Sequence, residues 1–317
     1  MKYSVITPVF NREDCIVRCI DSVVRNLNDE EDYLEHIIVN DGSEDDTEKM
    51  VKCYAEKYPH IQYITFPENR GTNAARNAAI SIAKGDYCII LDSDDYFTDN
   101  AIEMIDEIMK RNPSFRYYLF TSNDRLKYCE QTATLCKPQA IVTYQDFLLE
   151  KVVGDFIHVI ETSVLKNFPF DEEFRIYEGV FFMRFYKEVQ QMLFSKLVIT
   201  IRERSRSDSV SRTTFRTNKV VIRKRLKSLI LFKEWFETDL KRMKTGLVLV
   251  TKLYNQILEN ELLCGDYMAA KQIITIKGLK LHYCYKLVYY LRLGLVYRKI
   301  IYFYLFLKYR LLQRKIE

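Results

Sequence analysis

Three closely spaced carboxylates follow a short apolar run and are the residues of this sequence best suited to chemistry. The run Cys88–Leu91 leads into Asp92, Asp94 and Asp95, with Ser93 after the first of them. Such a run predicts a central parallel strand, and open α/β sheets bind ligands beyond the carboxyl ends of these strands. The carboxylates repel one another unless a cation joins them, and their oxygens suit Mg²⁺ or Mn²⁺ sharing a phosphate. The alternative is an acidic loop that caps the next helix.

The residues before this cluster predict three repeats of strand, loop and helix. Strands are expected at 3–7, 34–39 and 61–66, and helices up to 27, from 43 to 58 and from 72 to 84. Pro8 should stop the first strand, and Ser43 should cap the second helix. Right-handed crossovers place the loops after parallel strands at one sheet edge, so we expect residues 8–12, Asp41, Arg70 and 92–95 to converge there.

Four motifs in this order resemble the family 2 glycosyltransferases of the GT-A fold. The motifs are Val5–Asn11, Val39–Ser43, Asn69–Gly71 with Ala75–Asn77, and Leu91–Asp95. The resemblance covers residues 1–120 and continues weakly to residue 212. It implies an α/β fold of the GT-A type, with a Rossmann-like, mainly parallel sheet flanked by helices. It also implies transfer of a sugar from a nucleotide diphosphate donor, usually a UDP-sugar, with inversion at the anomeric carbon.

The resemblance assigns the nucleoside of the donor to the first two loops. Pro8, Phe10 and Arg12 would surround the nucleobase and ribose, and Asp41 would accept a hydrogen bond from the uracil ring N–H. An ionised carboxylate is an acceptor only, which suits this role. For Asp41 an Asx turn before Gly42 is a second interpretation, compatible with the first.

The donor phosphates and the metal ion are assigned to the next two loops. Arg70 and Arg76 would face the phosphates, although a solvated helix face is the alternative for Arg76. Asp92, Ser93 and Asp94 correspond to the DxD-type motif of the family, in which Asp94 is expected to ligate Mn²⁺ or Mg²⁺. This ion would neutralise and orient the leaving diphosphate. Asp95 is expected to cap the following turn.

The general base that removes the proton of the acceptor hydroxyl is less clearly marked. The segment Phe170–Arg184 matches the family context, but Gly179 stands where the second acid of a Glu-Asp pair is expected. Glu178 could substitute, because neighbouring aromatic residues would raise its pKa. Otherwise Glu178 only caps its helix and the protein is a slow or inactive transferase. His158 and Glu161 are weaker candidates, and His158 is better explained as a core or turn histidine.

A basic segment at 202–212 follows a strand expected at 197–201. It resembles the flexible loop that closes over the donor in this family, where its arginines could reach the pyrophosphate and exclude water. A solvated basic loop is the alternative. The sequence therefore predicts a glycosyltransferase domain at 1–212 and a helical C-terminal region at 213–317.

The C-terminal region is helical, basic and aromatic. Between Lys277 and Lys315 there are ten Lys or Arg residues and no acid. Its longest apolar run, 300–307, is too short to predict a transmembrane helix. Tyrosine-rich apolar faces flanked by cations suit an anionic membrane surface. The alternatives are a subdomain that packs on the catalytic domain or on a second copy in a homo-oligomer. Nucleic acid is not expected, because no binding module is present.

The remaining features favour an enzyme of the cytoplasm. The 317 residues are 48% hydrophobic, enough for one large domain with an appendage, and the eight scattered cysteines favour reduced thiols without structural zinc. The chain enters its first strand at once, so no signal peptide is predicted. We expect a metal-dependent transferase that acts on a glycan or lipid-linked acceptor, peripherally at the inner face of a membrane. A nucleotide-sugar-binding scaffold and a nucleotidyltransferase are the rival interpretations.

Overall fold

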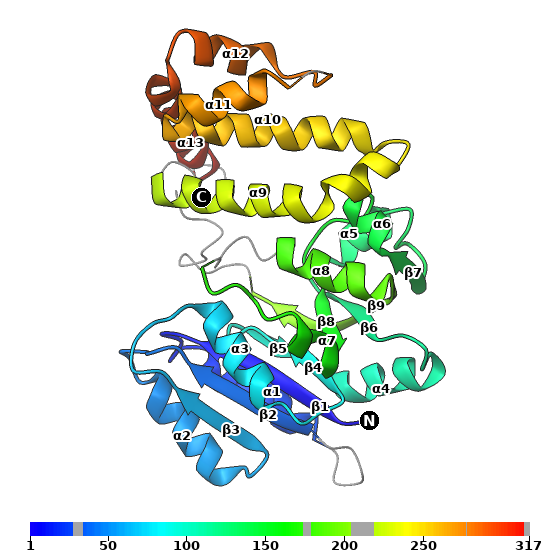
Figure 1. Cartoon of the computed structure of the whole chain (residues 1–317). Coiled ribbons are helices and arrows are strands. Elements are labelled where there is room, and N and C mark those ends of the chain that lie inside the picture. Colours follow the sequence, from blue (N-terminus) through cyan, green and yellow to red (C-terminus); the bar gives the residue numbers. More distant parts are fainter. Residues whose placement is uncertain (28–33, 174–178, 204–218, 277, 314–317) are drawn as a thin grey trace. The chain divides into compact units, whose positions relative to one another are not determined.

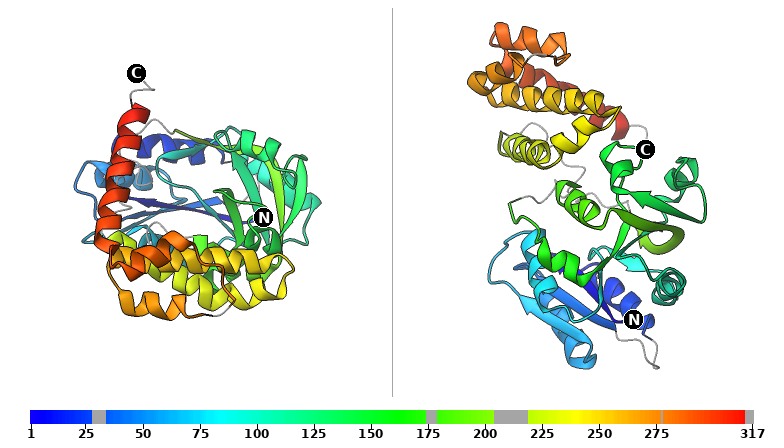
Figure 2. Two further views of the ribbon diagram at one scale, coloured as in Figure 1. Left: turned by 90° about the horizontal axis from the view of Figure 1, so that it is seen from above. Right: turned by 45° about the vertical axis from the view of Figure 1, so that its right-hand side comes forward.

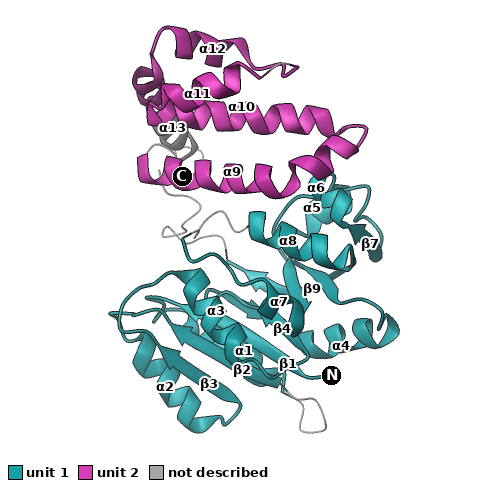
Figure 3. Ribbon diagram, viewed as in Figure 1, with its two compact units in different colours: residues 1–206 teal, residues 207–317 magenta. Residues whose placement is uncertain are grey.

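The structure is a computed structural model that describes residues 1–27, 34–173, 179–203, 219–276 and 278–313. The chain divides into two compact units, residues 1–206 and 207–317 (Figure 3). The boundary between the predicted domains, at 212, lies outside the described residues, and that division of function stays a prediction.

The first unit is built on one mixed sheet with helices on both faces (Figure 1). Within the described residues the sheet has nine strands in the order β3-β2-β1-β4-β8-β6-β9-β5, and β7 pairs with β9. The strands are β1 (Tyr3–Val9), β2 (Leu34–Asn40), β3 (Ile61–Thr65), β4 (Tyr87–Ile90), β5 (Asp95–Phe97), β6 (Tyr117–Ser122), β7 (Gln139–Thr143), β8 (Ile157–Glu161) and β9 (Gln191–Arg202). The expected mainly parallel α/β architecture is confirmed for β1 to β4, which are all parallel.

The helices of the first unit pack on both faces of the sheet, against side chains that alternate between the two faces along each strand. They are α1 (Ile16–Arg25), α2 (Thr47–Lys57), α3 (Thr72–Ile82), α4 (Ala101–Arg111), α5 (Leu126–Gln131), α6 (Tyr144–Leu148), α7 (Thr162–Asn167) and α8 (Gly179–Val189). Tyr3, Val5 and Val9 of β1 join the core beneath α1 and α4. Because successive strand residues point to opposite faces, Ile6 faces the other side, where α3 packs against β1 and β2.

Two local expectations, for Pro8 and Ser43, are corrected. Pro8 does not stop the first strand, since it lies buried inside β1 and pairs in register with Val39. Ser43 does not cap α2, which begins at Thr47; its hydroxyl accepts a hydrogen bond from the N–H of Asn11 instead. The strand expected over the apolar run 88–91 is β4, which ends at Ile90; the chain then turns and re-enters the sheet as β5.

The second unit is helical, as the sequence predicts. Its described helices are α9 (Lys219–Arg242), α10 (Gly246–Cys264), α11 (Tyr267–Ile274), α12 (Tyr283–Tyr290) and α13 (Gly294–Gln313). Helices α9 and α10 lie side by side (Figure 2), and α10 also packs against α11, α12 and α13. Among the described helices none combines the length and apolar character that crossing a membrane requires.

Candidate active site

The loops after β1 and β2 are joined by hydrogen bonds at the carboxyl edge of the sheet. The N–H of Arg12 donates to the hydroxyl of Thr47 over 2.8 Å, and the N–H of Glu44 donates to the side-chain oxygen of Asn11 over 2.9 Å. Asn11 has a φ of 49°, a backbone conformation that asparagine tolerates better than most residues. Phe10 and Arg12 are both half-buried in the loop that follows β1, the strand that contains the buried Pro8.

Asp41 connects the loop after β2 with the loop after β3. Its carboxylate accepts hydrogen bonds from the backbone N–H of Arg70 over 2.7 Å and of Gly71 over 2.9 Å, and the residue is only 3% exposed. The turn after β2 is closed instead by Asn40, whose side-chain oxygen accepts from the N–H of Ser43. The structure thus fixes Asp41 at the expected edge, where carboxylate lone pairs beyond these bonds remain for a ligand.

The two arginines assigned to the phosphates have different environments. Arg70 has half of its side chain exposed, lies over the ring of Phe66 at 4.7 Å and pairs with Glu172 over 3.2 Å. Arg76 is 7% exposed at its side chain and pairs with Asp92 over 2.9 Å between Nη2 and Oδ1. The alternative of a solvated helix face is therefore wrong for Arg76.

The carboxylate loop lies between β4 and β5 and rests on α1. The thiols of Cys15 and Cys19 contact the backbone oxygens of Ser93 and Asp92 at 3.6 and 3.8 Å. Ser93 is buried, whereas Asp92 and Asp94 are partly exposed. Burial raises the pKa of Asp92, but the charges of Arg76 and Arg202 outweigh it and hold the pKa below the usual value. The two arginines therefore favour the ionised form of Asp92, which precedes Asp94 by two residues in the same loop.

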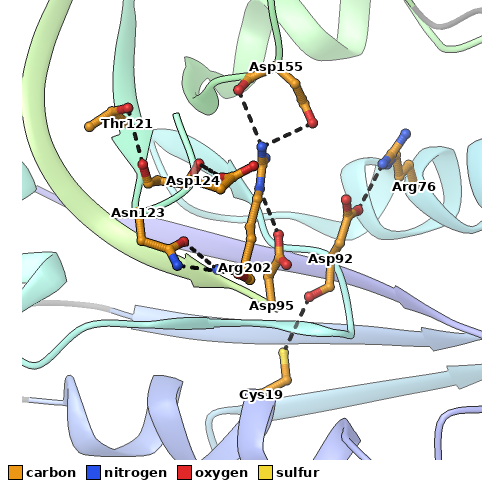
Figure 4. A network of polar contacts seen from close by, with 10 residues as sticks. Cys19, Arg76, Asp92, Asp95, Thr121, Asn123, Asp124, Asp155 and Arg202 are labelled. Atoms are coloured by element: carbon orange, nitrogen blue, oxygen red, sulfur yellow. Dashed lines mark hydrogen bonds and ion pairs between the residues drawn. The ribbon is translucent and has the colours of Figure 1, made fainter. Parts of the chain in front are cut away.

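Arg202 holds this loop from the opposite strand (Figure 4). Its Nε lies 3.0 Å from Oδ2 of Asp95, its Nη1 lies 3.1 Å from Oδ2 of Asp155, and its backbone N–H donates to Asn123 over 2.8 Å. The side chains of Arg202 and Asp95 are 9% and 11% exposed. One expectation is corrected, because Asp95 pairs with Arg202 rather than capping a turn. Arg202 is the last residue of β9, and the part of the predicted donor-closing loop from residue 204 to residue 212 lies outside the described residues.

The surroundings of Asp95 shift its pKa in opposite directions. Burial, followed by the negative charge of Asp92, raises the pKa of Asp95, while Arg202 acts in the other direction. Burial lowers the pKa of Arg202, but Asp155, Asp95 and Asp92 reverse this effect and raise it above its usual value. Arg202 therefore stays cationic and compensates the acidic loop from β9, as Arg76 does from α3.

The segment that leads to the predicted base is anchored on α3. The side chain of Asn77 donates to the backbone oxygen of Phe170 and accepts from its N–H, both over 2.8 Å. Asn73 donates to the backbone oxygen of Asp171 over 2.9 Å. Glu178 and the rest of 174–178 lie outside the described residues, and α8 begins at Gly179.

The two weaker candidates for the base have structural partners. His158 is 6% exposed, bonds through Nδ1 to the hydroxyl of Tyr117 and stacks on Phe182 at 4.2 Å, which fits the interpretation as a core histidine. Burial, with Arg202 next, lowers its pKa to about 3. Glu161 pairs with Arg116 over 2.6 Å and lies opposite Tyr87 at the start of β4. That is the opposite end of the strand from Asp92.

A metal ion would find part of its ligands here. Within the described part of the chain, no group of three or more His, Cys, Asp or Glu side chains is arranged to hold one. Mg²⁺ and its analogues need only one or two protein carboxylates when substrate phosphates complete the coordination. Asp92 and Asp94, two partly exposed carboxylates of one loop, meet that number, so the residues present fit a divalent ion shared with a diphosphate.

Sequence reasoning missed Arg202, Asp155 and the two asparagines of α3. The position of Arg202 at the end of an apolar run indicated that it lies at the end of a strand. Its partners Asp95 and Asp155 are 107 and 47 residues away in the chain, so no local pattern revealed them. Asn77 stood within a quoted motif without an assigned role. Its role depends on a segment that comes 93 residues later.

Comparisons with known proteins agree with this geometry. Residues 4–144 match the model of glycosyl transferase family 2. The poly(ribitol-phosphate) beta-glucosyltransferase of Bacillus spizizenii is 41% identical over 115 residues, which cover 36% of this chain and 18% of that protein. A GalNAc(5)-diNAcBac-PP-undecaprenol beta-1,3-glucosyltransferase of Campylobacter jejuni is 29% identical over 192 residues, 59% of this chain and 60% of that one. The chain thus spans less than two thirds of the length of these relatives.

Solved structures show the same fold at low sequence identity. TarS 1-349 of S. aureus in complex with UDP-GlcNAc has a TM-score of 0.61 and 19% identity, over 86% of this chain and 89% of that one. The mannosyltransferase PcManGT of Pyrobaculum calidifontis in complex with GDP-Man and Mn²⁺ has a TM-score of 0.56 and 16% identity, over 94% and 86%. The GT-A-like fold of these structures agrees with the family match at the motifs, and residues 4–144 of this chain belong to glycosyl transferase family 2.

Proposed function

We propose that this protein transfers a sugar from a UDP-sugar to a glycan or lipid-linked acceptor, with inversion and with Mn²⁺ or Mg²⁺ as cofactor. The observation that carries the proposal is the acidic loop Asp92–Asp95 held between Arg76 and Arg202 at the edge where Asp41 also lies. Ligands of open α/β sheets bind at this edge. The relatives favour sugar transfer over nucleotidyl transfer, and the UDP-GlcNAc complex of TarS supports a uridine donor.

In the proposed reaction the acceptor hydroxyl attacks the anomeric carbon as the bond to the diphosphate breaks. The UDP leaves with the bonding electrons, and the acceptor proton goes to a carboxylate, for which Glu178 is our candidate. Asp94, with Asp92, would hold the divalent ion, which supplies positive charge to the leaving diphosphate. Arg70 and Arg76 contribute cationic charge at the same edge, and Asp41, which holds the backbone of Arg70 and Gly71, would accept a hydrogen bond from the N–H of the uracil ring.

We further propose that the acceptor is presented at a membrane surface, in the cytoplasm at its inner face. The undecaprenol-linked substrate in the name of the C. jejuni relative supports this part of the proposal. The exposed aromatic and apolar side chains of α12 and α13 support it from the structure.

A donor experiment tests the proposed chemistry. We expect purified protein with Mn²⁺ to hydrolyse one member of a panel of UDP-sugars slowly, because water replaces the missing acceptor. Asp94→Ala should weaken binding of UDP measured by calorimetry with Mn²⁺ and leave the unfolding midpoint unchanged. Glu178→Gln should abolish hydrolysis and retain UDP binding. Binding of UDP-sugar without hydrolysis would favour a scaffold, and unchanged UDP affinity in Asp94→Ala would contradict the metal assignment.

A further inference from the structure

Helix α12 carries a row of exposed apolar side chains on one side. Tyr283, Leu287 and Tyr290 are 73%, 53% and 70% exposed, at spacings of four and three residues. Residues with these spacings lie on the same side of a helix. The residues between them, Tyr285 and Tyr289, are half-buried, so α12 turns its other side toward the unit.

Helix α13 repeats this pattern. Val296, Ile300, Phe303 and Leu307 are each at least 40% exposed and follow one another at spacings of four, three and four. The other side of the helix is fixed to the unit, where the hydroxyl of Tyr297 donates to Glu259 of α10 over 3.2 Å. We call these four residues, together with Tyr283, Leu287 and Tyr290, the apolar face. Rows of exposed apolar residues on two helices that contact each other mark an interaction surface.

The charged residues of α12, α13 and the turn between them have a single sign. Lys299 is exposed on α13, Lys286 is half-exposed on α12, and Arg292 is exposed between the helices. From 277 to 315 the chain has ten Lys or Arg residues and no acid. A second copy docked through the same face would place these cations opposite one another, without carboxylates of the segment to pair with them. An anionic surface is the complementary partner.

We propose that the apolar face docks on an anionic lipid bilayer. The side chains of Leu287, Ile300 and Phe303 enter the boundary of the acyl chains, the tyrosine rings lie at the headgroups, and the lysines meet the lipid phosphates. This inference deepens the membrane part of the proposed function and names its surface. It does not require that the first unit transfer a sugar.

Vesicle sedimentation of the full chain tests the proposal. We expect the protein to sediment with vesicles of phosphatidylcholine and phosphatidylglycerol, more weakly with phosphatidylcholine alone, and less as salt is added. Leu287→Glu with Phe303→Glu should lower the partition coefficient by at least about tenfold, because two inserted side chains become anions. Val248→Glu is the matched control, since this exposed residue of α10 lies outside the apolar face and should leave binding unchanged.

A second variant keeps the test valid if the double glutamate variant does not fold. Lys286→Gln with Lys299→Gln should retain the thermal unfolding midpoint and lose the preference for anionic vesicles. Absence of sedimentation of the wild type, or wild-type binding by both variants, would overturn the proposal. A concentration-dependent dimer in light scattering that Leu287→Glu with Phe303→Glu dissolves would assign the face to a second copy. Donor hydrolysis by the same preparations reports separately on the proposed chemistry.

Discussion

Arg202 and Asp95 form an ion pair with little access to solvent. At the scale of residues, we predict how much the free energy of unfolding falls when this pair is broken. Removing one partner of a buried pair costs about 3–5 kcal/mol because the other charge stays buried, whereas replacing both costs less. We expect Arg202→Met to lower the free energy of unfolding by about 3 kcal/mol. Adding Asp95→Asn should recover much of this loss. Urea denaturation of both single variants and the double variant measures the coupling.

The control for this prediction is an ion pair of the same unit that is open to solvent. Arg18 pairs with Glu203 over 2.6 Å, with side chains 38% and 42% exposed. Exposed pairs contribute about 0–1 kcal/mol, so Arg18→Met should change stability little. Strictly additive effects of Arg202→Met and Asp95→Asn would show that the two side chains do not stabilise each other.

At the scale of elements, Asn77 attaches the segment after α7 to helix α3. Asn77→Ala removes two hydrogen bonds to the backbone of Phe170, each worth about 0.5–1.5 kcal/mol net. We expect the free energy of unfolding to fall by about 1–3 kcal/mol and the amide of Phe170 to exchange faster. Hydrogen–deuterium exchange and urea denaturation measure the two effects. Ser81→Ala, on the exposed side of α3, should change neither, and unaltered exchange at Phe170 in Asn77→Ala would contradict the attachment.

The elements also show what the sequence alone could predict. Strands β1 to β4 and helices α1 to α3 follow one another with short loops, so local hydrophobic patterns and crossover rules predict their arrangement. Strand β8 lies between β4 and β6, and its pairing with β4 joins residues 70 to 74 positions apart, for example Tyr87 and Glu161. Such antiparallel pairings leave no local signal. The partners of Arg202 stayed hidden for the same reason, although its strand was expected.

Within the site, residue types could be predicted better than their environments. Asp41, Arg70 and Asp92 lie at the expected edge because each directly follows a parallel strand or its loop. Whether Arg76 faced solvent or the acidic loop depended on packing of α3 against that loop, which a helical pattern does not reveal.

At the scale of the whole molecule, two buried histidines predict sensitivity of the first unit to acid. Burial, with His60 next, lowers the pKa of His36 to about 3, and His158 is shifted to about the same value. Both pKa values lie near 6.5 in the unfolded chain. Below that pH the unfolded chain therefore binds more protons than the folded chain, and the folded state loses stability. We expect each histidine to cost about 2 kcal/mol of stability by pH 5. Urea midpoints that stay constant from about pH 7 to 5 would contradict this.

The second unit should respond to pH in the opposite direction through Glu261 of α10. This residue is 7% exposed, and burial, followed by the charge of Asp266, raises its pKa from 4.5 to about 7. The folded protein then holds the proton more tightly, so the stability due to Glu261 is complete below pH 4.5 and is lost as the pH rises through 7. Glutamine stays neutral throughout this range and has nearly the same shape.

We therefore expect Glu261→Gln to be more stable than the wild type by about 3 kcal/mol at pH 8 and by less than about 1 kcal/mol at pH 5. Urea denaturation followed by circular dichroism at both pH values measures the difference. Glu234→Gln changes an exposed carboxylate on α9 and should match the wild type at both. If Glu261→Gln stabilised the protein by the same amount at both pH values, then packing of this residue, rather than ionisation of its carboxyl group, would limit the stability of the second unit.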